Sequence, residues 1–162
     1  MIKPSHGDML AAAQRAGDKE LEGLLADPDS YILRTTEMTG VEYHQIFRVV
    51  FVDTDHPMSF WLATDTMGNA ATVLSQNLAG VHAFLRAESA LLSGDGLPER
   101  FHDLYRHQGV QSKLLDTPRA VVERSAGDVH LKLAVQSDGD REVWKIALPA
   151  QGEPSLTVEP LQ

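Results

Sequence analysis

The chain has 162 residues, and its 23 acidic against 14 basic side chains give a formal net charge of −9 at pH 7. This acidic balance argues against a dedicated binder of nucleic acid or of an anionic membrane, because both of those partners select a basic protein surface. The sequence contains no cysteine, which excludes disulfides, thiolate nucleophiles and cysteine-based zinc sites.

The first predicted element is a helix that begins after an Asp8 N-cap and ends near Ala26, with alanines and leucines at helical spacing along one face. Pro28 ends this helix, because proline disfavours helical backbone in the residue before it. β-branched and aromatic residues then predict three strands, the last of them after a polar turn at residues 53–57. The strands are expected at residues 31–36, 41–52 and 58–64.

Two helices are predicted in the middle of the chain. The first is expected from an Asn69 N-cap to about Leu92, with its apolar side chains on one side. The second is short and begins near Pro98, since the first helical turn accepts proline, and Gly109 is its expected C-cap. Its inward-facing residues are expected to be Phe101, Leu104 and Tyr105.

The C-terminal third predicts an antiparallel β-meander. Apolar and polar residues alternate over residues 129–136 and again over residues 143–148. The intervening Asp138 and Gly139 form the preferred two-residue hairpin turn, which places Leu133 opposite Trp144. This register puts all the large apolar side chains on one face, and a slip of one residue would destroy that agreement.

A second turn, at Ala126 and Gly127, adds a strand and places Glu123 opposite His130. Residues 149–162 are interpreted as a short edge strand or a loose tail. The element order predicts one α+β domain over residues 1–162, with helices packed on a curved, mainly antiparallel sheet. The sequence shows neither a signal-peptide pattern nor an apolar stretch of the ~20 residues that a membrane-spanning helix needs, so we expect a cytoplasmic protein.

Two segments resemble the NTF2-like (SnoaL-like) superfamily. Residues 11–27 resemble its opening helix, with an alanine-rich turn, the Gly17–Asp18 pair and a leucine stripe, and residues 142–146 resemble its late tryptophan strand. The resemblance implies a cone-shaped, cystatin-like fold with an apolar pocket between helices and sheet. That superfamily includes isomerases, dehydratases, cyclases and binding proteins, so the resemblance implies no single activity.

Four aromatic residues are candidates for the wall of such a pocket: Tyr43, Trp61, Tyr105 and Trp144. Tyrosine and tryptophan bring a polar atom to an apolar wall, although plain core packing explains the same residues. Catalysis, if the protein is an enzyme, would be proton transfer by a general acid or base, with His44 and Asp53 as candidates. We expect a small apolar ligand and no cofactor, because the sequence lacks nucleotide-binding and nucleophile-elbow motifs.

Two other hypotheses stay open at this point. In the first, Asp53, Asp55 and His56 hold a divalent metal ion, although turn formation explains the same residues. In the second, the protein is an acidic interaction module, such as a chaperone, immunity or assembly factor, with a basic protein partner and no enzymatic activity. The outer face of the meander mixes Val121 with charged residues, as either a solvent-facing sheet or a homodimer interface would.

Overall fold

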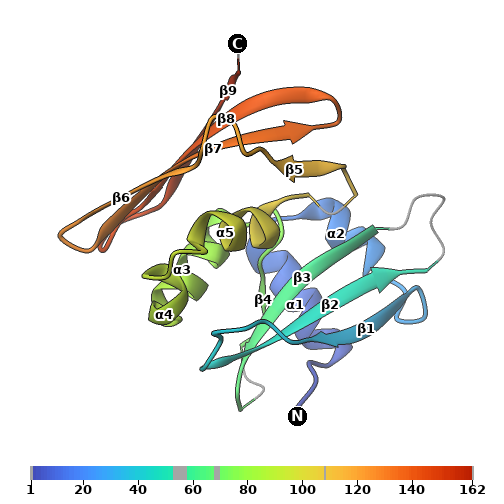
Figure 1. Ribbon diagram of the computed structural model, residues 1–162. Coiled ribbons are helices and arrows are strands. Elements are labelled where there is room, and N and C mark those ends of the chain that lie inside the picture. The colour runs from blue at the N-terminus through green and yellow to red at the C-terminus, as the bar shows by residue number, and fades with distance from the viewer. Residues whose placement is uncertain (1, 53–57, 68–69, 108, 162) are drawn as a thin grey trace.

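A computed structural model describes residues 2–52, 58–67, 70–107 and 109–161, and Figure 1 shows the arrangement of its elements. The helices are α1 (His6–Ala16), α2 (Lys19–Leu24), α3 (Leu78–Ala87), α4 (Ser89–Leu92) and α5 (Leu97–Tyr105). The strands form two antiparallel sheets. The α+β class is therefore confirmed.

The first sheet, sheet A, has the order β1-β2-β3-β4. Its strands are β1 (Tyr31–Thr36), β2 (His44–Phe51), β3 (Met58–Asp65) and β4 (Thr72–Val73). The second sheet, sheet B, has the order β5-β7-β8-β9, and β6 also pairs with β7. Its strands are β5 (Ser112–Leu114), β6 (Val121–Ser125), β7 (Asp128–Ser137), β8 (Asp140–Leu148) and β9 (Ser155–Pro160).

The elements are stacked in layers (Figure 1). One apolar cluster joins α1 and α2 to the β2 and β3 side chains on one face of sheet A, such as Phe47 and Leu62. A second cluster joins α3, α4 and α5 to the opposite face of sheet A, through Ile46 and Ala63, and to the inner face of sheet B. Because neighbouring residues of a strand point to opposite faces, Ile46 and Phe47 contribute to different clusters.

The single curved sheet expected from the sequence is wrong, since the strands form two sheets, and the NTF2-like cone is not confirmed. The helices α3–α5 pack between the two sheets and supply apolar side chains to the cluster that both share. The strands before and after these helices therefore pair only within their own sheet. None of the helices in the described part of the chain has the length and apolar character needed to cross a membrane.

The N-terminal helix begins earlier than predicted and is broken. Ser5, not Asp8, is the N-cap of α1, and the two residues form a capping box in which each side chain accepts the other's backbone N–H. Gly17 then ends α1 in the left-handed conformation, at φ 71°, and Asp18 caps α2 by accepting the N–H of Leu21. Glycine adopts this backbone without steric cost, which explains the break.

The second predicted helix also begins at a different residue. Asn69, its expected cap, lies outside the described residues, and the cap of α3 is Asn77. Between Asn69 and Asn77, the residues Thr72 and Val73 form β4, which pairs with β3. The C-cap predicted at Gly109 is wrong as well, because α5 ends at Tyr105 and Arg106 occupies the cap position.

The C-terminal meander is as predicted. Leu133 lies opposite Trp144, and Glu123 lies opposite His130. Asp138 and Gly139 both have positive φ, 48° and 90°, as the two-residue turn requires. Of the two interpretations of residues 149–162, the edge strand is the correct one, because β9 pairs with β8.

Candidate functional site

A pocket of about 360 Å³ lies where the end of α5 and the start of β5 meet the inner face of sheet B. Tyr105 comes from the last turn of α5, and Ser112 is the first residue of β5. Glu142 and Trp144 point into it from β8, because even-numbered residues of that strand face the helices. Leu156 and Val158 of β9 complete an apolar side of the wall.

Ring contacts and a hydrogen bond fix the aromatic side chains of this pocket in place. The rings of Tyr105 and Trp144 are perpendicular, with centroids 5.8 Å apart, and Tyr105 stacks on Phe101 at 5.6 Å. The indole N–H of Trp144 donates to Glu142 Oε2 over 3.0 Å. A site whose rings are already fixed spends little conformational entropy when a ligand binds.

Ser112, which lines the pocket, is hydrogen-bonded to His102, which is not among the described residues that line it. Ser112 Oγ lies 2.8 Å from Nε2 of His102, which is in the middle of α5 and only 4% exposed. Burial lowers the pKa of His102 below its usual value, although the neighbouring Asp103 carboxylate acts in the opposite direction. The imidazole is therefore neutral at pH 7, and in the tautomer that carries its hydrogen on Nδ1, the free Nε2 can accept the hydroxyl hydrogen of Ser112.

The carboxylate nearest in sequence to His102, that of Asp103, does not complete a Ser–His–Asp triad. Asp103 Oδ1 lies 4.0 Å from Nδ1 of His102, which is beyond hydrogen-bond distance, and its side chain is 57% exposed. Asp103 follows His102 directly on the same helix, so the two side chains leave the helix in different directions. The geometry is consequently a Ser–His dyad that can move a proton, without the oriented carboxylate of a full triad.

Of the four aromatic candidates, Tyr105 and Trp144 meet at this pocket. Trp61 packs against the apolar cluster of α3–α5 and is not among the described residues that line the pocket. Its indole nitrogen is buried without a hydrogen-bond partner in the described structure. Tyr43 precedes β2 and is 58% exposed.

His44 lies beside a different buried group. Its Nδ1 is 3.5 Å from Oε2 of Glu88, whose side chain is fully buried, and its ring meets Phe84 edge-on at 5.0 Å. The Glu88 carboxylate also accepts the backbone N–H groups of Glu42 and Tyr43, at 2.6 and 2.8 Å. These contacts tie the α3–α4 junction to the segment before β2, and His44 is not among the described residues that line the pocket.

The predicted metal ligands Asp53, Asp55 and His56 lie outside the described residues, and so does Asp53 as a catalytic candidate. Over the described residues, 2–52, 58–67, 70–107 and 109–161, no group of three or more potential protein ligands is arranged to hold a metal ion.

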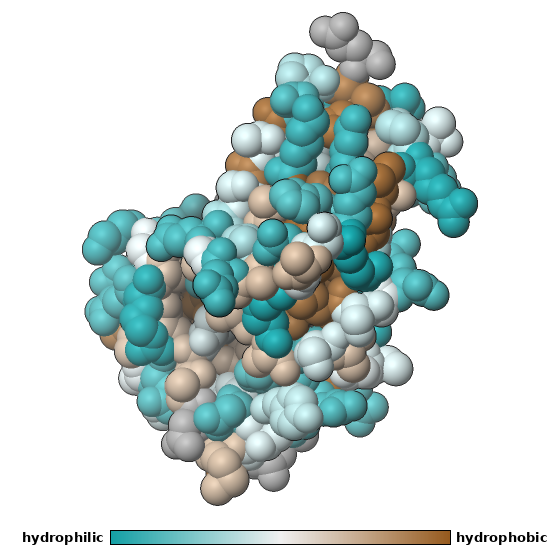
Figure 2. Space-filling view, turned by 90° about the vertical axis from the view of Figure 1, so that its left-hand side faces the viewer, coloured by the Kyte–Doolittle hydropathy of each residue, from teal (hydrophilic) through white to brown (hydrophobic). Residues whose placement is uncertain are grey.

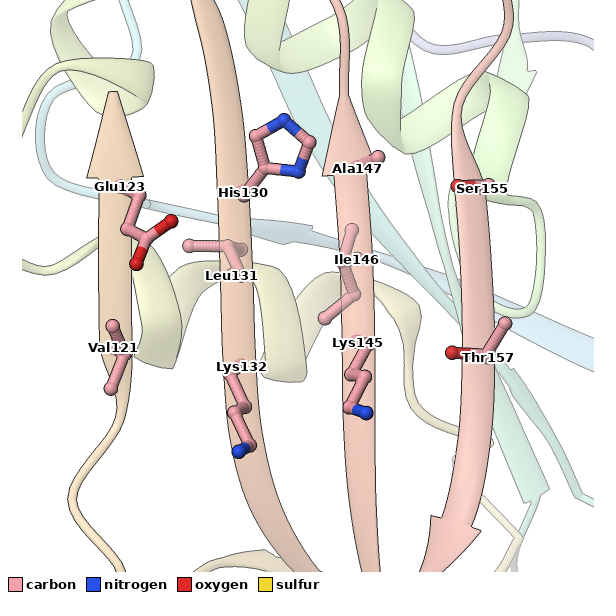
Figure 3. A pocket seen from close by; sticks show the side chains of 10 residues that line it. All are labelled: Val121, Glu123, His130, Leu131, Lys132, Lys145, Ile146, Ala147, Ser155 and Thr157. Carbon is pink, nitrogen blue, oxygen red and sulfur yellow. The ribbon is translucent and has the colours of Figure 1, made fainter. Parts of the chain in front are cut away.

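The outer face of sheet B carries a shallower groove of about 320 Å³. Lys132 and Lys145 face each other there on the neighbouring strands β7 and β8 (Figure 3). Lys145 also forms an ion pair with Glu159 of β9, at 3.1 Å. Figure 2 shows hydrophilic and hydrophobic side chains interleaved over the upper part of the molecule, which sheet B forms.

No protein-family model matches the chain, and the comparison with curated proteins gave no match either. The NTF2-like resemblance therefore stays a prediction. Neither Ser112 nor His102 is among the candidate site residues predicted from the sequence. The contact between them joins residues ten positions apart on two different elements, and the sequence shows no specific signal for it.

Proposed function

We propose that this protein binds a small ligand in the pocket of Tyr105 and Trp144, and that the Ser112–His102 dyad moves a proton at that ligand. The observation that carries the proposal is the 2.8 Å hydrogen bond between the buried His102 Nε2 and Oγ of Ser112, which lines that pocket. Concave sites with aromatic walls and a few convergent polar groups are typical of ligand-binding sites.

The proposed chemistry is general base catalysis through a hydroxyl relay. Ser112 accepts a proton from the ligand while its own hydroxyl proton passes to Nε2 of His102. The products are a deprotonated ligand, an unchanged serine and an imidazolium ion, so protons and charge balance. Burial lowers the pKa of His102 below its usual value and so keeps the imidazole in the neutral form that such a base needs. A positioned base of this kind contributes about 10²–10⁴-fold in rate.

Binding is tested through the fluorescence of Trp144. The chain has two tryptophans, so Trp61→Phe leaves Trp144 as the only one. We expect a saturable change in its fluorescence with members of a panel of small cyclic ketones, alcohols and amines. Tyr105→Ala should weaken that response, whereas the matched variant of the exposed Tyr43, Tyr43→Ala, should leave it unchanged. No saturable response to any panel member, and no bound mass in native mass spectrometry, would overturn the proposal.

Proton transfer is tested separately, by ¹H NMR in D₂O on the ketones that bind. We expect the protein to accelerate deuterium incorporation next to the carbonyl, and we expect Ser112→Ala and His102→Gln to remove that acceleration while binding persists. Equal exchange rates with the wild type and both variants would restrict the proposal to binding.

A second proposal concerns the outer face of sheet B, which we infer to be a contact between two copies of this chain. The positive Lys132 and Lys145 lie on the central strands β7 and β8, while Glu123 and Glu159 lie on the flanking strands β6 and β9. A twofold axis can therefore place the lysines of each copy against the glutamates of the other, around the exposed Val121.

Sedimentation velocity over a range of protein concentrations tests this contact. We expect a dimer that Lys132→Glu dissociates, because the substitution places a glutamate against a glutamate of the other copy. The matched variant Lys19→Glu, on α2 and 87% exposed, should leave the dimer intact. A monomer at every concentration would contradict the proposal.

A further inference from the structure

We infer that the ligand of the Tyr105–Trp144 pocket carries a positive charge, as a protonated amine or another compact organic cation does. The inference rests on the proposed ligand-binding function and assigns the chemical class of the ligand. It combines three features of the described residues: the charges that line the pocket, the charges of the cavity on its Gln76–His107 side, and the orientation of its aromatic rings.

The pocket wall contains a carboxylate and no permanent cation. Among the described residues that line it, Glu142 is the one acidic side chain, and neither lysine nor arginine is present. Glu142 Oε2 accepts the Trp144 indole N–H, and the described structure shows no partner for the other carboxylate oxygen. A partly enclosed carboxylate with a free oxygen pairs with a cationic ligand and repels an anionic one.

A neighbouring cavity of about 240 Å³ extends this negative potential. It shares Gln76 and His107 with the pocket, so the two cavities are adjacent. Its wall adds the carboxylates of Asp18 and Glu20, and no lysine or arginine among the described residues lines it. Acidic groups therefore flank the pocket on this side, which raises the local concentration of cations there.

The aromatic rings suit a cation as well. An ammonium group is attracted to the face of a tryptophan or tyrosine ring, by about 0.5–2 kcal/mol. Trp144 and Tyr105 lie at 90° to each other, and the Glu142 carboxylate is bonded to the edge of the Trp144 ring. One group on the ligand can thus contact a ring and the carboxylate together. The net charge of −9 adds a long-range attraction for cations.

Three probes that differ in charge but share one ring test the inference: benzylammonium, benzyl alcohol and benzoate. Each is titrated at neutral pH and low salt against the Trp61→Phe protein, with Trp144 fluorescence as the readout. We expect benzylammonium to bind about tenfold more tightly than benzyl alcohol, and benzoate to bind most weakly.

Glu142→Gln removes the charge but keeps an oxygen that can accept the Trp144 indole N–H, so the ring stays in place. We expect this variant to lose the tenfold advantage of benzylammonium and to bind benzyl alcohol as before. The matched control, Glu159→Gln on the outer face, should change none of the three affinities. High salt should weaken the binding of benzylammonium and not that of benzyl alcohol.

Equal or tighter binding of benzyl alcohol or benzoate would overturn the charge assignment and leave the pocket itself intact. An unchanged advantage of benzylammonium in Glu142→Gln would also overturn it. Failure of all three probes, together with failure of the wider panel, would overturn the ligand-binding function on which this inference rests.

Discussion

His44 and Glu88 lie side by side inside the molecule, with Nδ1 of the histidine 3.5 Å from Oε2 of the glutamate. The same carboxylate accepts two backbone N–H groups from the segment before β2. We expect Glu88→Gln to lower the free energy of unfolding by about 2–4 kcal/mol, because an amide accepts these bonds less strongly and adds a buried donor. Urea unfolding measures the loss.

The matched control for that substitution is Glu99→Gln, on the exposed side of α5. It should change the free energy of unfolding by less than about 0.5 kcal/mol. Equal stabilities of the Glu88→Gln and Glu99→Gln proteins would show that the buried carboxylate contributes nothing specific.

Replacing each of two helical glycines by alanine should change the stability of the protein in opposite directions. A Cβ at Gly23 of α2 meets no atom within 4 Å, so Gly23→Ala should stabilise the protein by about 0.5–1 kcal/mol. A Cβ at Gly80 of α3 would lie 2.5 Å from the carbonyl oxygen of Val73, which belongs to β4. Gly80→Ala should therefore destabilise the protein by about 1–3 kcal/mol. Thermal unfolding of both variants checks the pair, and a stabilised Gly80→Ala protein would mean that α3 can move away from β4.

The pH dependence of stability should contain a contribution from His102. Burial lowers its pKa in the folded protein below the unfolded value of 6.5, so the unfolded chain binds the proton more readily. The contribution of His102 to the free energy of unfolding therefore keeps its full value above pH 6.5, and it decreases as the pH falls from there through the pKa of His102 in the folded protein. Urea unfolding between pH 8 and about pH 5 should show a smaller loss for His102→Gln than for the wild type. Parallel pH profiles for the two proteins would contradict this assignment.

Ser112→Ala should destabilise the protein moderately. The substitution removes the partner of His102 Nε2, and leaving a buried polar atom without a partner costs about 1–3 kcal/mol. Ser137→Ala is the matched control, because Ser137 lies directly opposite Ser112 on β7 and lines the same pocket. Equal unfolding midpoints for the two variants would indicate that the Ser112–His102 bond contributes nothing to stability.

The C-terminal meander could be predicted from the sequence because its information is local. The alternation of β7 and β8 and the turn at Asp138 and Gly139 lie within residues 128–148, and together they specify the register. Sequence reasoning also recovered β1, whose predicted and observed bounds agree.

The start of α3 could not be predicted in the same way. Asn69 and Asn77 are both suitable caps, and only the pairing of Val73 with Leu62 shows that the intervening residues belong to sheet A. That pairing joins residues eleven positions apart and depends on where β3 ends. The division of the strands into two sheets is likewise a tertiary property. Alternating apolar and polar residues indicate that one face of a strand is buried, but they do not show which element covers that face.

For the site, the sequence predicted which kinds of side chain take part, but not which of them lie close together in the fold. Tyr105 and Trp144 were selected because their rings carry polar atoms, and they do meet at one pocket. His44 was selected as a titratable residue on a strand, whereas the histidine that is hydrogen-bonded to the pocket residue Ser112 is His102. The serine beside it comes from a three-residue strand, whose position depends on pairing with β7.

The apolar cluster around α3–α5 contains Ile46 of sheet A and Leu131 of sheet B alike. A fragment that begins at Ser112 would keep every strand of sheet B but lose the helices that cover its inner face. That fragment would expose a continuous apolar surface and associate with itself rather than fold alone. In the intact chain, amide hydrogens in the centres of β3 and β7 should exchange with solvent through the same opening event, since separating either sheet from the helices disrupts one shared core.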